Sequence, residues 1–215
     1  MLRRRPIHPG ALRHAAERRG DQLVLLSAAS PVDLCALAAS VPGDFRFAVK
    51  MPRTITHERR LADCAAPLET FLGECRALAP KLGPLLVQLP PSLVFDPRTD
   101  FFATLRARFA GAVVCEPRHP SWFTPAADAL LKGWHVARAA ADPAGVPQAA
   151  EPGGDTSFAY FRWHGSPCIY YSDYAPAQLA ALAARLPAKA WCVFDNTALG
   201  HATTNALALR ELTAR

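Results

Sequence analysis

Polar side chains follow six short apolar runs of this sequence, at the point where each run ends. They are Lys50, Gln88, Glu116, Asp142, Arg162 with His164, and Asp195. Such groups can exchange protons or hold an anion, and arginine binds phosphate or carboxylate through two parallel hydrogen bonds. The pattern indicates acid–base or anion-binding chemistry if one fold brings the six run ends together.

Three side chains are candidates for catalysis, namely Glu116, His164 and Asp195. Glu116 suits a general acid or base, and Arg118, two residues later, would then act as an electrostatic clamp. The alternative is a structural ion pair of Glu116 with Arg118 or with Lys50. The residue types alone leave both interpretations open.

The stretch FRFAVKMPRTITHERRL gathers Lys50, Arg53 and His57 where an apolar run gives way to a helix-like segment. We interpret these three as ligand-binding residues that form an anion cradle. Thr56 is then expected to be the N-cap of a helix that starts near Glu58. The alternative is a plain connection between strand and helix in which the cations are solvated.

Further ligand contacts are predicted for Gln88, Arg118, Trp122, Asp142, Arg162 and Tyr170. Arg162 lies beside His164 late in the chain, where many α/β barrels bind phosphate. Trp122 could stack on a ligand ring or cap the core of the domain. Tyr170 could close over the ligand or pack against the protein, and the amide of Gln88 is expected to orient a neighbouring group.

No metal ion or cofactor is predicted. The side chains that could supply a metal cluster are His57, His119, His164, Glu116, Asp142 and Asp195, but they show no local spacing such as H-x-H, and neighbouring arginines oppose a cation. The six cysteines show no C-x-x-C spacing and are interpreted as small core residues in a reducing cytoplasm. No G-x-S-x-G motif indicates a serine nucleophile.

Length and composition predict one domain over residues 1–215, with 51% hydrophobic residues for a single core. No apolar run approaches the roughly 20 residues that span a membrane, so a cytoplasmic protein without membrane contact is expected. The net charge of +6 is concentrated in the first 20 residues, which hold six arginines and one glutamate, whereas the rest holds 18 basic and 17 acidic residues. The high pI therefore does not by itself indicate nucleic-acid binding.

Apolar runs alternate with Ala/Leu-rich segments of helical period, which is typical of βα units around a parallel sheet. We predict strands near 23–27, 45–49, 85–88, 112–116, 134–138, 158–163 and 191–195, and helices near 9–19, 31–40, 61–79, 99–109, 125–132, 176–186 and 201–213. Pro31, Pro125 and Pro176 mark helix starts. The irregular stretch 142–157 is expected to be a functional lid or a disordered excursion. A closed or nearly closed βα barrel is favoured over a doubly wound open sheet, and in either fold ligands bind beyond the carboxyl ends of the strands.

Five ordered motifs carry a resemblance to a known family. They are FRFAVKMPRTITHERRL, KLGPLLVQLPPS, CEPRHPSW, FRWHG with YYSDYAPAQL, and FDNTALGHATTNAL, which together span residues 45 to about 210. In this order they resemble the YecE-like TIM-barrel family, a widespread bacterial domain of unknown function. The resemblance implies a (β/α)8 barrel with these strand ends at its mouth, and it implies no established reaction.

The chain departs from the family pattern at its amino end. HPGALRHAAERRG resembles the first helix, so the first strand is expected to be missing and about seven strands to remain; Leu25 or Leu26 lies where the family carries a carboxylate. Either the chain begins late, through a mis-set start codon, or it is a degenerate member. An open barrel would expose an apolar gap, which predicts self-association.

The sequence thus predicts a cytosolic TIM-barrel protein with a polar, cationic mouth for a phosphate- or carboxylate-bearing ligand, and a hydrolytic reaction is one interpretation of its acid–base groups. A non-catalytic module that binds an anion or nucleic acid is the alternative, together with a scaffold that has lost activity.

Overall fold

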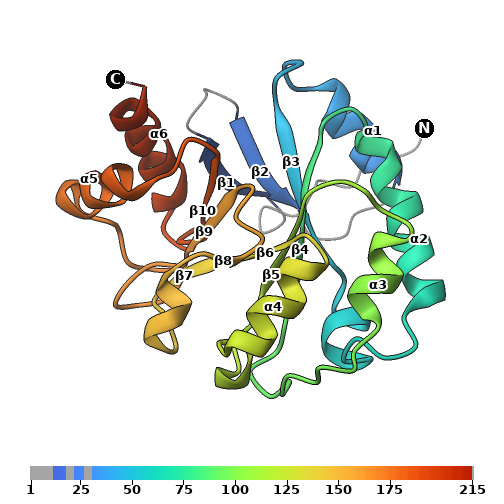
Figure 1. Cartoon of the computed structure of the whole chain (residues 1–215). Helices are drawn as coiled ribbons and strands as arrows, with labels where there is room; N and C mark the ends of the chain where they lie inside the picture. Colours follow the sequence, from blue (N-terminus) through green and yellow to red (C-terminus); the bar gives the residue numbers. More distant parts are fainter. Residues whose placement is uncertain (1–11, 18–21, 27–30, 215) are drawn as a thin grey trace.

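The computed structural model describes residues 12–17, 22–26 and 31–214. Its strands are β1 (Leu12–Glu17), β2 (Gln22–Leu26), β3 (Arg46–Lys50), β4 (Leu82–Gln88), β5 (Val113–Glu116), β6 (Val136–Arg138), β7 (Ala140–Asp142), β8 (Gly153–Gly154), β9 (Ala159–Trp163) and β10 (Ala190–Phe194). Its α-helices are α1 (Pro31–Ala39), α2 (Ala65–Cys75), α3 (Phe101–Arg106), α4 (Pro125–Gly133), α5 (Pro176–Arg185) and α6 (His201–Thr213). Figure 1 shows the helices arranged around the strands.

The sheet closes on itself through β6 and β7, which are separated only by Ala139. β6 pairs with β5 on one side, and β7 pairs with β9 on the other, both in parallel. The remaining neighbours follow in the order β9, β10, β1, β2, β3, β4 and β5. If β6 and β7 are taken as one position and the two-residue β8 as an addition, the ring has eight strand positions. This is the TIM-barrel architecture that the alternation of elements predicted.

The first strand position is filled by β1, which corrects the prediction of a helix over residues 9–19 and of a seven-strand barrel. β1 runs antiparallel to both neighbours, with Ala15 opposite Leu23 of β2 and Val193 of β10. The remainder of the predicted helix, residues 9–11 and 18–19, lies outside the described residues. Alanine favours a helix, but helix propensity amounts to less than about 1 kcal/mol per residue, and pairing with two otherwise unpaired strand edges outweighs it.

Side chains alternate between the barrel interior and the surrounding helices. In β3, Ala48 belongs to the interior cluster, whereas Phe47 and Val49 pack in the outer core. The interior cluster is small and contains Ala48, Leu86, Val114, Ala137, Ala139, Tyr160 and Val193. The outer core is divided into one part under α2, α3 and α4 and another under α5 and α6.

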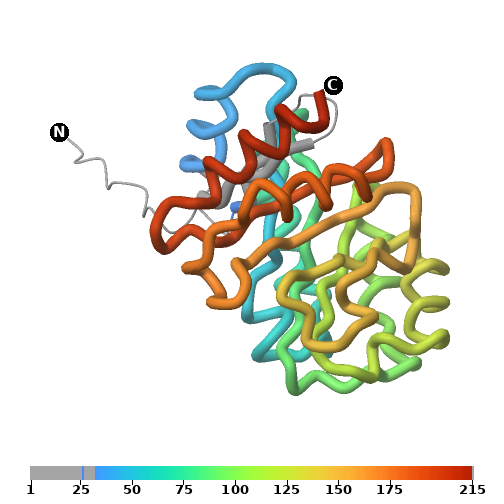
Figure 2. The backbone as a smooth tube through the Cα atoms, turned by 90° about the vertical axis from the view of Figure 1, so that its left-hand side faces the viewer, coloured from blue at the N-terminus to red at the C-terminus, as the bar shows by residue number. Residues whose placement is uncertain are grey.

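The helices begin where the prolines predicted, because α1, α4 and α5 start at Pro31, Pro125 and Pro176. α5 and α6 pack against each other, and α6 also contacts β1 and β10; Figure 2 shows these two helices together. No α-helix follows β7. The connection to β9 instead contains the 3-10 turn Pro147–Ala150 and the short strand β8.

Candidate active site at the barrel mouth

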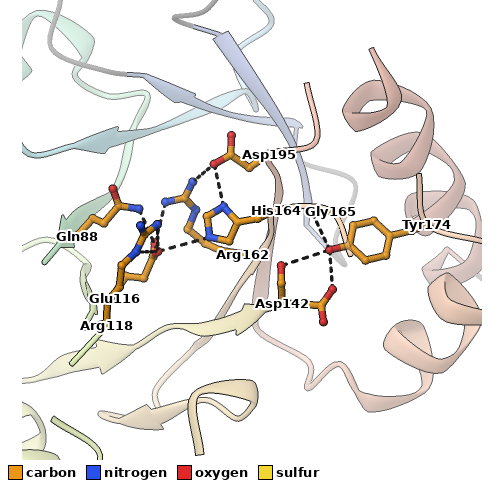
Figure 3. A network of polar contacts seen from close by, with 9 residues as sticks. All are labelled: Gln88, Glu116, Arg118, Asp142, Arg162, His164, Gly165, Tyr174 and Asp195. Atoms are coloured by element: carbon orange, nitrogen blue, oxygen red, sulfur yellow. Dashed lines mark hydrogen bonds and ion pairs between the residues drawn. The ribbon is translucent and has the colours of Figure 1, made fainter. Parts of the chain in front are cut away.

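A polar layer lies directly above the interior apolar layer of the barrel. In five strands, the residue two positions after an interior apolar residue is polar, and the five are Lys50, Gln88, Glu116, Arg162 and Asp195. Period-two alternation points such pairs to the same side, so these side chains share the inner face at the carboxyl ends of the strands. Five of the six strand ends that the sequence pointed to therefore face the interior, and Figure 3 shows Gln88, Glu116, Arg162 and Asp195 among them.

Arg162 is the centre of a buried ion network. Its side chain is 0% exposed, and its Nη1 donates to Glu116 Oε2 at 2.7 Å. Its Nη2 donates to Asp195 Oδ2 at 2.5 Å. One guanidinium thus joins the ends of β5 and β10, and a planar cation with several donors suits a bridge between two carboxylates.

His164 lies between the same two carboxylates. Its Nδ1 is 3.0 Å from Asp195 Oδ2, and its Nε2 is 3.5 Å from Glu116 Oε1. The backbone N–H of His164 donates to the carbonyl oxygen of Asp142 at 2.8 Å. Both the ring and the backbone of His164 are therefore fixed, with one ring nitrogen bonded to Asp195 and the other facing Glu116.

Glu116 is held as a carboxylate. Burial would raise its pKa, but the Arg162 guanidinium, His164 and Arg118 together hold the pKa well below its ordinary value of 4.5. Its Oε1 also accepts from Gln88 Nε2 at 3.0 Å and from Arg118 Nη2 at 3.2 Å. A carboxylate with this many donors is a weak base and remains ionised at neutral pH.

A cavity of about 380 Å³ opens above this network. Glu116, His164 and Arg118 contribute polar groups to it. The other lining residues are mainly apolar, and they are Pro91, Pro117, Phe123, Ala141, Pro143, Gly145, Val146, Ala149, Ile169 and Tyr170. A concave site with apolar walls and a few convergent polar groups is the usual form of a small-molecule site.

Comparison with known proteins places this arrangement in a family. The family model described as "Protein of unknown function DUF72" matches residues 29–215. The chain belongs to the DUF72 family. This confirms the resemblance that the five motifs carried.

Three relatives illustrate how far the similarity extends. Over 99 residues the chain is 35% identical to the UPF0759 protein YecE of Escherichia coli (strain K12), a match that covers 43% of this chain and 35% of YecE. The match thus spans about a third of the length of that curated relative. A DUF72 family protein of Thermotoga maritima has a crystal structure with a TM-score of 0.75 and 24% identity, covering 90% of this chain and 85% of that one. A DUF72 protein of Enterococcus faecalis gives a TM-score of 0.70 at 18% identity, covering 89% and 85%. These two structures show the shared barrel fold.

The predicted anion cradle of this DUF72 chain, Lys50, Arg53 and His57, brings further basic groups near Arg118. Burial lowers the pKa of His57, and the nearby charges of Arg53, Lys50 and Arg118 lower it further. The predicted cradle residues are therefore close enough to act on one another. The predicted cap is wrong, because Thr56 is buried inside the π-helical turn Thr54–Glu58 and its hydroxyl donates to the carbonyl oxygen of Pro52 at 3.2 Å.

Two predicted ligand contacts point elsewhere. The ring of Trp122 is buried against Phe95 and Phe102 in the outer core, and its indole N–H donates to the carbonyl oxygen of Leu93 at 2.9 Å. Asp142 accepts a hydrogen bond from the Tyr174 hydroxyl at 2.7 Å, apart from the Glu116 network (Figure 3). Neither residue lines the mouth cavity, since Trp122 packs in the outer core and Asp142 lines a neighbouring pocket with Trp163 and Tyr174.

Tyr170 lines the cavity, and its ring meets that of His164 edge to face at 6.3 Å between centroids, while its ligand contact stays a prediction. Sequence reasoning missed Phe123, Ile169 and the wall residues between Pro143 and Ala149. The loop at 142–157 was the one signal for the last group. Phe123 and Ile169 carried no signal, because single apolar residues in connections look alike in a sequence.

Two classes of feature are absent from the described part of the chain. Within residues 12–17, 22–26 and 31–214, no three His, Cys, Asp or Glu side chains are placed to hold a metal ion. Among the helices of the same residues, none is long and apolar enough to cross a membrane.

Proposed function

We propose that the mouth cavity binds a small ligand with an anionic group and an apolar part about the size of an aromatic ring, and that His164 is the acid–base group for a hydrolytic reaction on it. The observation that supports this is the fixed Asp195–His164 pair beneath a cavity whose walls are apolar. The volume of about 380 Å³ suits a compact molecule.

Arg118 is the cation that would meet the anionic group. Its side chain is 37% exposed, whereas that of Arg162 is 0% exposed and is bonded to two buried carboxylates through Nη1 and Nη2. Arg118 also shares one oxygen of Glu116 with Gln88, at donor distances of 3.2 and 3.0 Å. Turning from this shared carboxylate to a ligand phosphate or carboxylate costs Arg118 less than any rearrangement of Arg162 would.

His164 has the arrangement of a general base. If its Nδ1 carries the proton and donates it to Asp195, the lone pair of Nε2, which faces Glu116 Oε1 at 3.5 Å, would take a proton from a water molecule held between the ring and the ligand. The neighbouring Glu116 carboxylate would stabilise the imidazolium that forms. In this scheme Glu116 acts by its charge, and the acid–base role that the sequence suggested for it belongs to His164.

The proposal is tested by isothermal titration calorimetry with phenyl phosphate, inorganic phosphate and a single-stranded DNA of about eight nucleotides. Phenyl phosphate is expected to bind more tightly than inorganic phosphate. Arg118→Gln should weaken phenyl phosphate binding roughly tenfold, because one charged hydrogen-bonding partner is lost. Arg98→Gln is the matched control, since Arg98 is 89% exposed and, within the described residues, forms its ion pair with the nearby Asp96.

Catalysis is tested separately with a panel of aryl phosphate and carboxylate esters. His164→Gln should abolish any turnover while phenyl phosphate still binds. If the wild type binds neither phosphate compound, or if Arg118→Gln behaves like Arg98→Gln, the proposed site is refuted. Preferential binding of the oligonucleotide would instead favour a nucleic-acid module.

A further inference from the structure

The apolar wall of the mouth cavity is built partly by a segment that takes the place of a barrel helix. Residues 143–154 comprise the connection that follows β7 and the short strand β8 at its end, and Pro143, Gly145, Val146 and Ala149 of this segment line the cavity. A connection without a helix has few backbone hydrogen bonds of its own, so its position depends on contacts with the rest of the protein. The side chains that hold it therefore decide the shape of the cavity.

Arg138 holds the far end of this segment. Its side chain is 10% exposed and extends from β6, where its Nη1 donates to the carbonyl oxygens of Gln148 at 3.0 Å and Glu151 at 3.4 Å. Its Nε donates to Asp128 Oδ1 of α4 at 3.4 Å. One buried guanidinium thus joins the segment to the strand and to the helix behind it.

The two glycines of β8 lie against the Arg138–Asp128 pair, where a side chain would not fit. Gly153 is paired with Arg138 in the sheet, and a Cβ at Gly153 would overlap both the Arg138 guanidinium and the Asp128 carboxylate. The N–H of Gly154 donates to the same oxygen of Asp128 at 2.8 Å. The last two residues of the segment, Gly153 and Gly154, therefore pack around the Arg138–Asp128 pair.

Arg138 also contacts a second part of the wall. Its Cζ lies 5.0 Å from the centre of the Phe123 ring, in a cation–π arrangement. Phe123 is a lining residue of the cavity and comes from the connection between β5 and α4. The same cation is therefore in contact with an aromatic wall and with the segment that carries the apolar wall.

From these contacts we infer that Arg138 is a positioning residue that sets the preference of the site for a ligand with an aromatic or similarly flat apolar group. Arg138 is not among the residues that line the cavity, and it acts through Phe123 and residues 143–149. This inference rests on the proposed ligand-binding function of the cavity. The polar end of the site, Arg118 with Glu116 and His164, is held by other contacts.

The test compares binding of phenyl phosphate and inorganic phosphate to the full chain carrying Arg138→Gln. Affinity for phenyl phosphate is expected to fall roughly tenfold, the effect of one or two lost hydrogen bonds, while affinity for inorganic phosphate stays unchanged. Arg185→Gln is the matched control. Arg185 forms an ion pair with Glu151 of the same segment at 2.7 Å, but both side chains are largely exposed and it contacts neither Gln148 nor Phe123 in the described structure.

Hydrogen exchange provides a readout that does not need a ligand. Arg138→Gln should speed exchange of the amides at 146–154 while those of β9 and β10 remain as in the wild type. Gly153→Ala should have the same effect, because the added methyl displaces the guanidinium. Phe123→Leu should lower the preference for phenyl phosphate and leave exchange at 146–154 unchanged.

The outcomes separate this inference from the proposed function. If the wild type binds neither phosphate compound, the proposed function fails, and with it the role of Arg138 in ligand preference. If binding occurs but Arg138→Gln weakens both compounds equally, or changes exchange no more than Arg185→Gln does, the role of Arg138 is refuted. Should Arg138→Gln not fold, Arg138→Lys and Phe123→Leu provide the test. If both of these variants keep the wild-type preference for phenyl phosphate, the inference is overturned.

Discussion

Replacing Arg162 by methionine should destabilise the barrel strongly at neutral pH. The change removes a side chain that is 0% exposed and bonded to Glu116 at 2.7 Å and to Asp195 at 2.5 Å, and it leaves two buried carboxylates behind. Breaking a buried ion pair from one side costs about 3–5 kcal/mol. Glu116 keeps Gln88 and Arg118 as donors, and Asp195 keeps His164, so we expect about 3 kcal/mol, near the lower end of that range.

The destabilisation caused by Arg162→Met should become smaller as the pH falls. In the wild type the folded pKa of Glu116 is depressed, so its contribution is full above its ordinary pKa of 4.5 and is lost as the pH falls through the folded value. Without Arg162, Glu116 is still buried, so the pKa of Glu116 in the folded variant rises. Protonation of Glu116 as the pH falls then removes the cost of a buried charge in the variant. The difference in free energy of unfolding between wild type and variant should therefore shrink between about pH 7 and about pH 4.5.

Urea denaturation followed by circular dichroism measures both effects. Arg185→Gln is the control, because it breaks an exposed ion pair and should cost less than about 1 kcal/mol. A loss below about 1 kcal/mol for Arg162→Met at neutral pH, or a loss that grows on acidification, would contradict the network described above.

Two further substitutions and one labelling experiment test other parts of the structure. Trp122→Ala should lower the free energy of unfolding by about 3–5 kcal/mol and leave phenyl phosphate affinity unchanged, because the ring is buried in the outer core; denaturation and calorimetry check this. Iodoacetamide at about pH 8 should label the exposed Cys35 and Cys168 in the native protein and spare Cys75, whose pKa burial raises to about 12, as mass spectrometry would show. Gly154→Ala should cost about 1–3 kcal/mol, because its φ of +63° and the Val136 carbonyl oppose a side chain, whereas Gly43→Ala has open space and is the control.

The barrel could be predicted because its strands are short apolar runs that end in polar residues. Each predicted strand from 23–27 to 191–195 overlaps an observed one, and the prolines locate three helix starts. β1 could not be predicted in this way. Its sequence, LRHAAE, has no apolar run, and it becomes a strand because the edges of β2 and β10 are available on both sides.

The polar part of the site was predictable for the same reason, since period-two alternation places Glu116, Arg162 and Asp195 on one face. The apolar walls were not. Phe123 and Val146 lie in connections, where neither period nor spacing indicates direction, and Arg138 looks like any other strand residue. Trp122 and Asp142 show the converse, because their position after a strand suggested the mouth while their side chains turn to the core and to Tyr174.

The strand β1 does not bring its carboxyl end to the mouth, because it runs antiparallel to β2 and β10. In a parallel barrel the last residue of each strand lies at the mouth, as Glu116 does for β5. β1 is reversed, so Leu12 is the residue paired with Leu26 at that end, whereas Glu17 is paired with Trp191 near the start of β10. The carboxyl end of β1 therefore lies at the opposite end of the barrel from that of β5. The acidic groups that pair with Arg162 come from the end of β5 and from the residue that follows β10, namely Glu116 and Asp195.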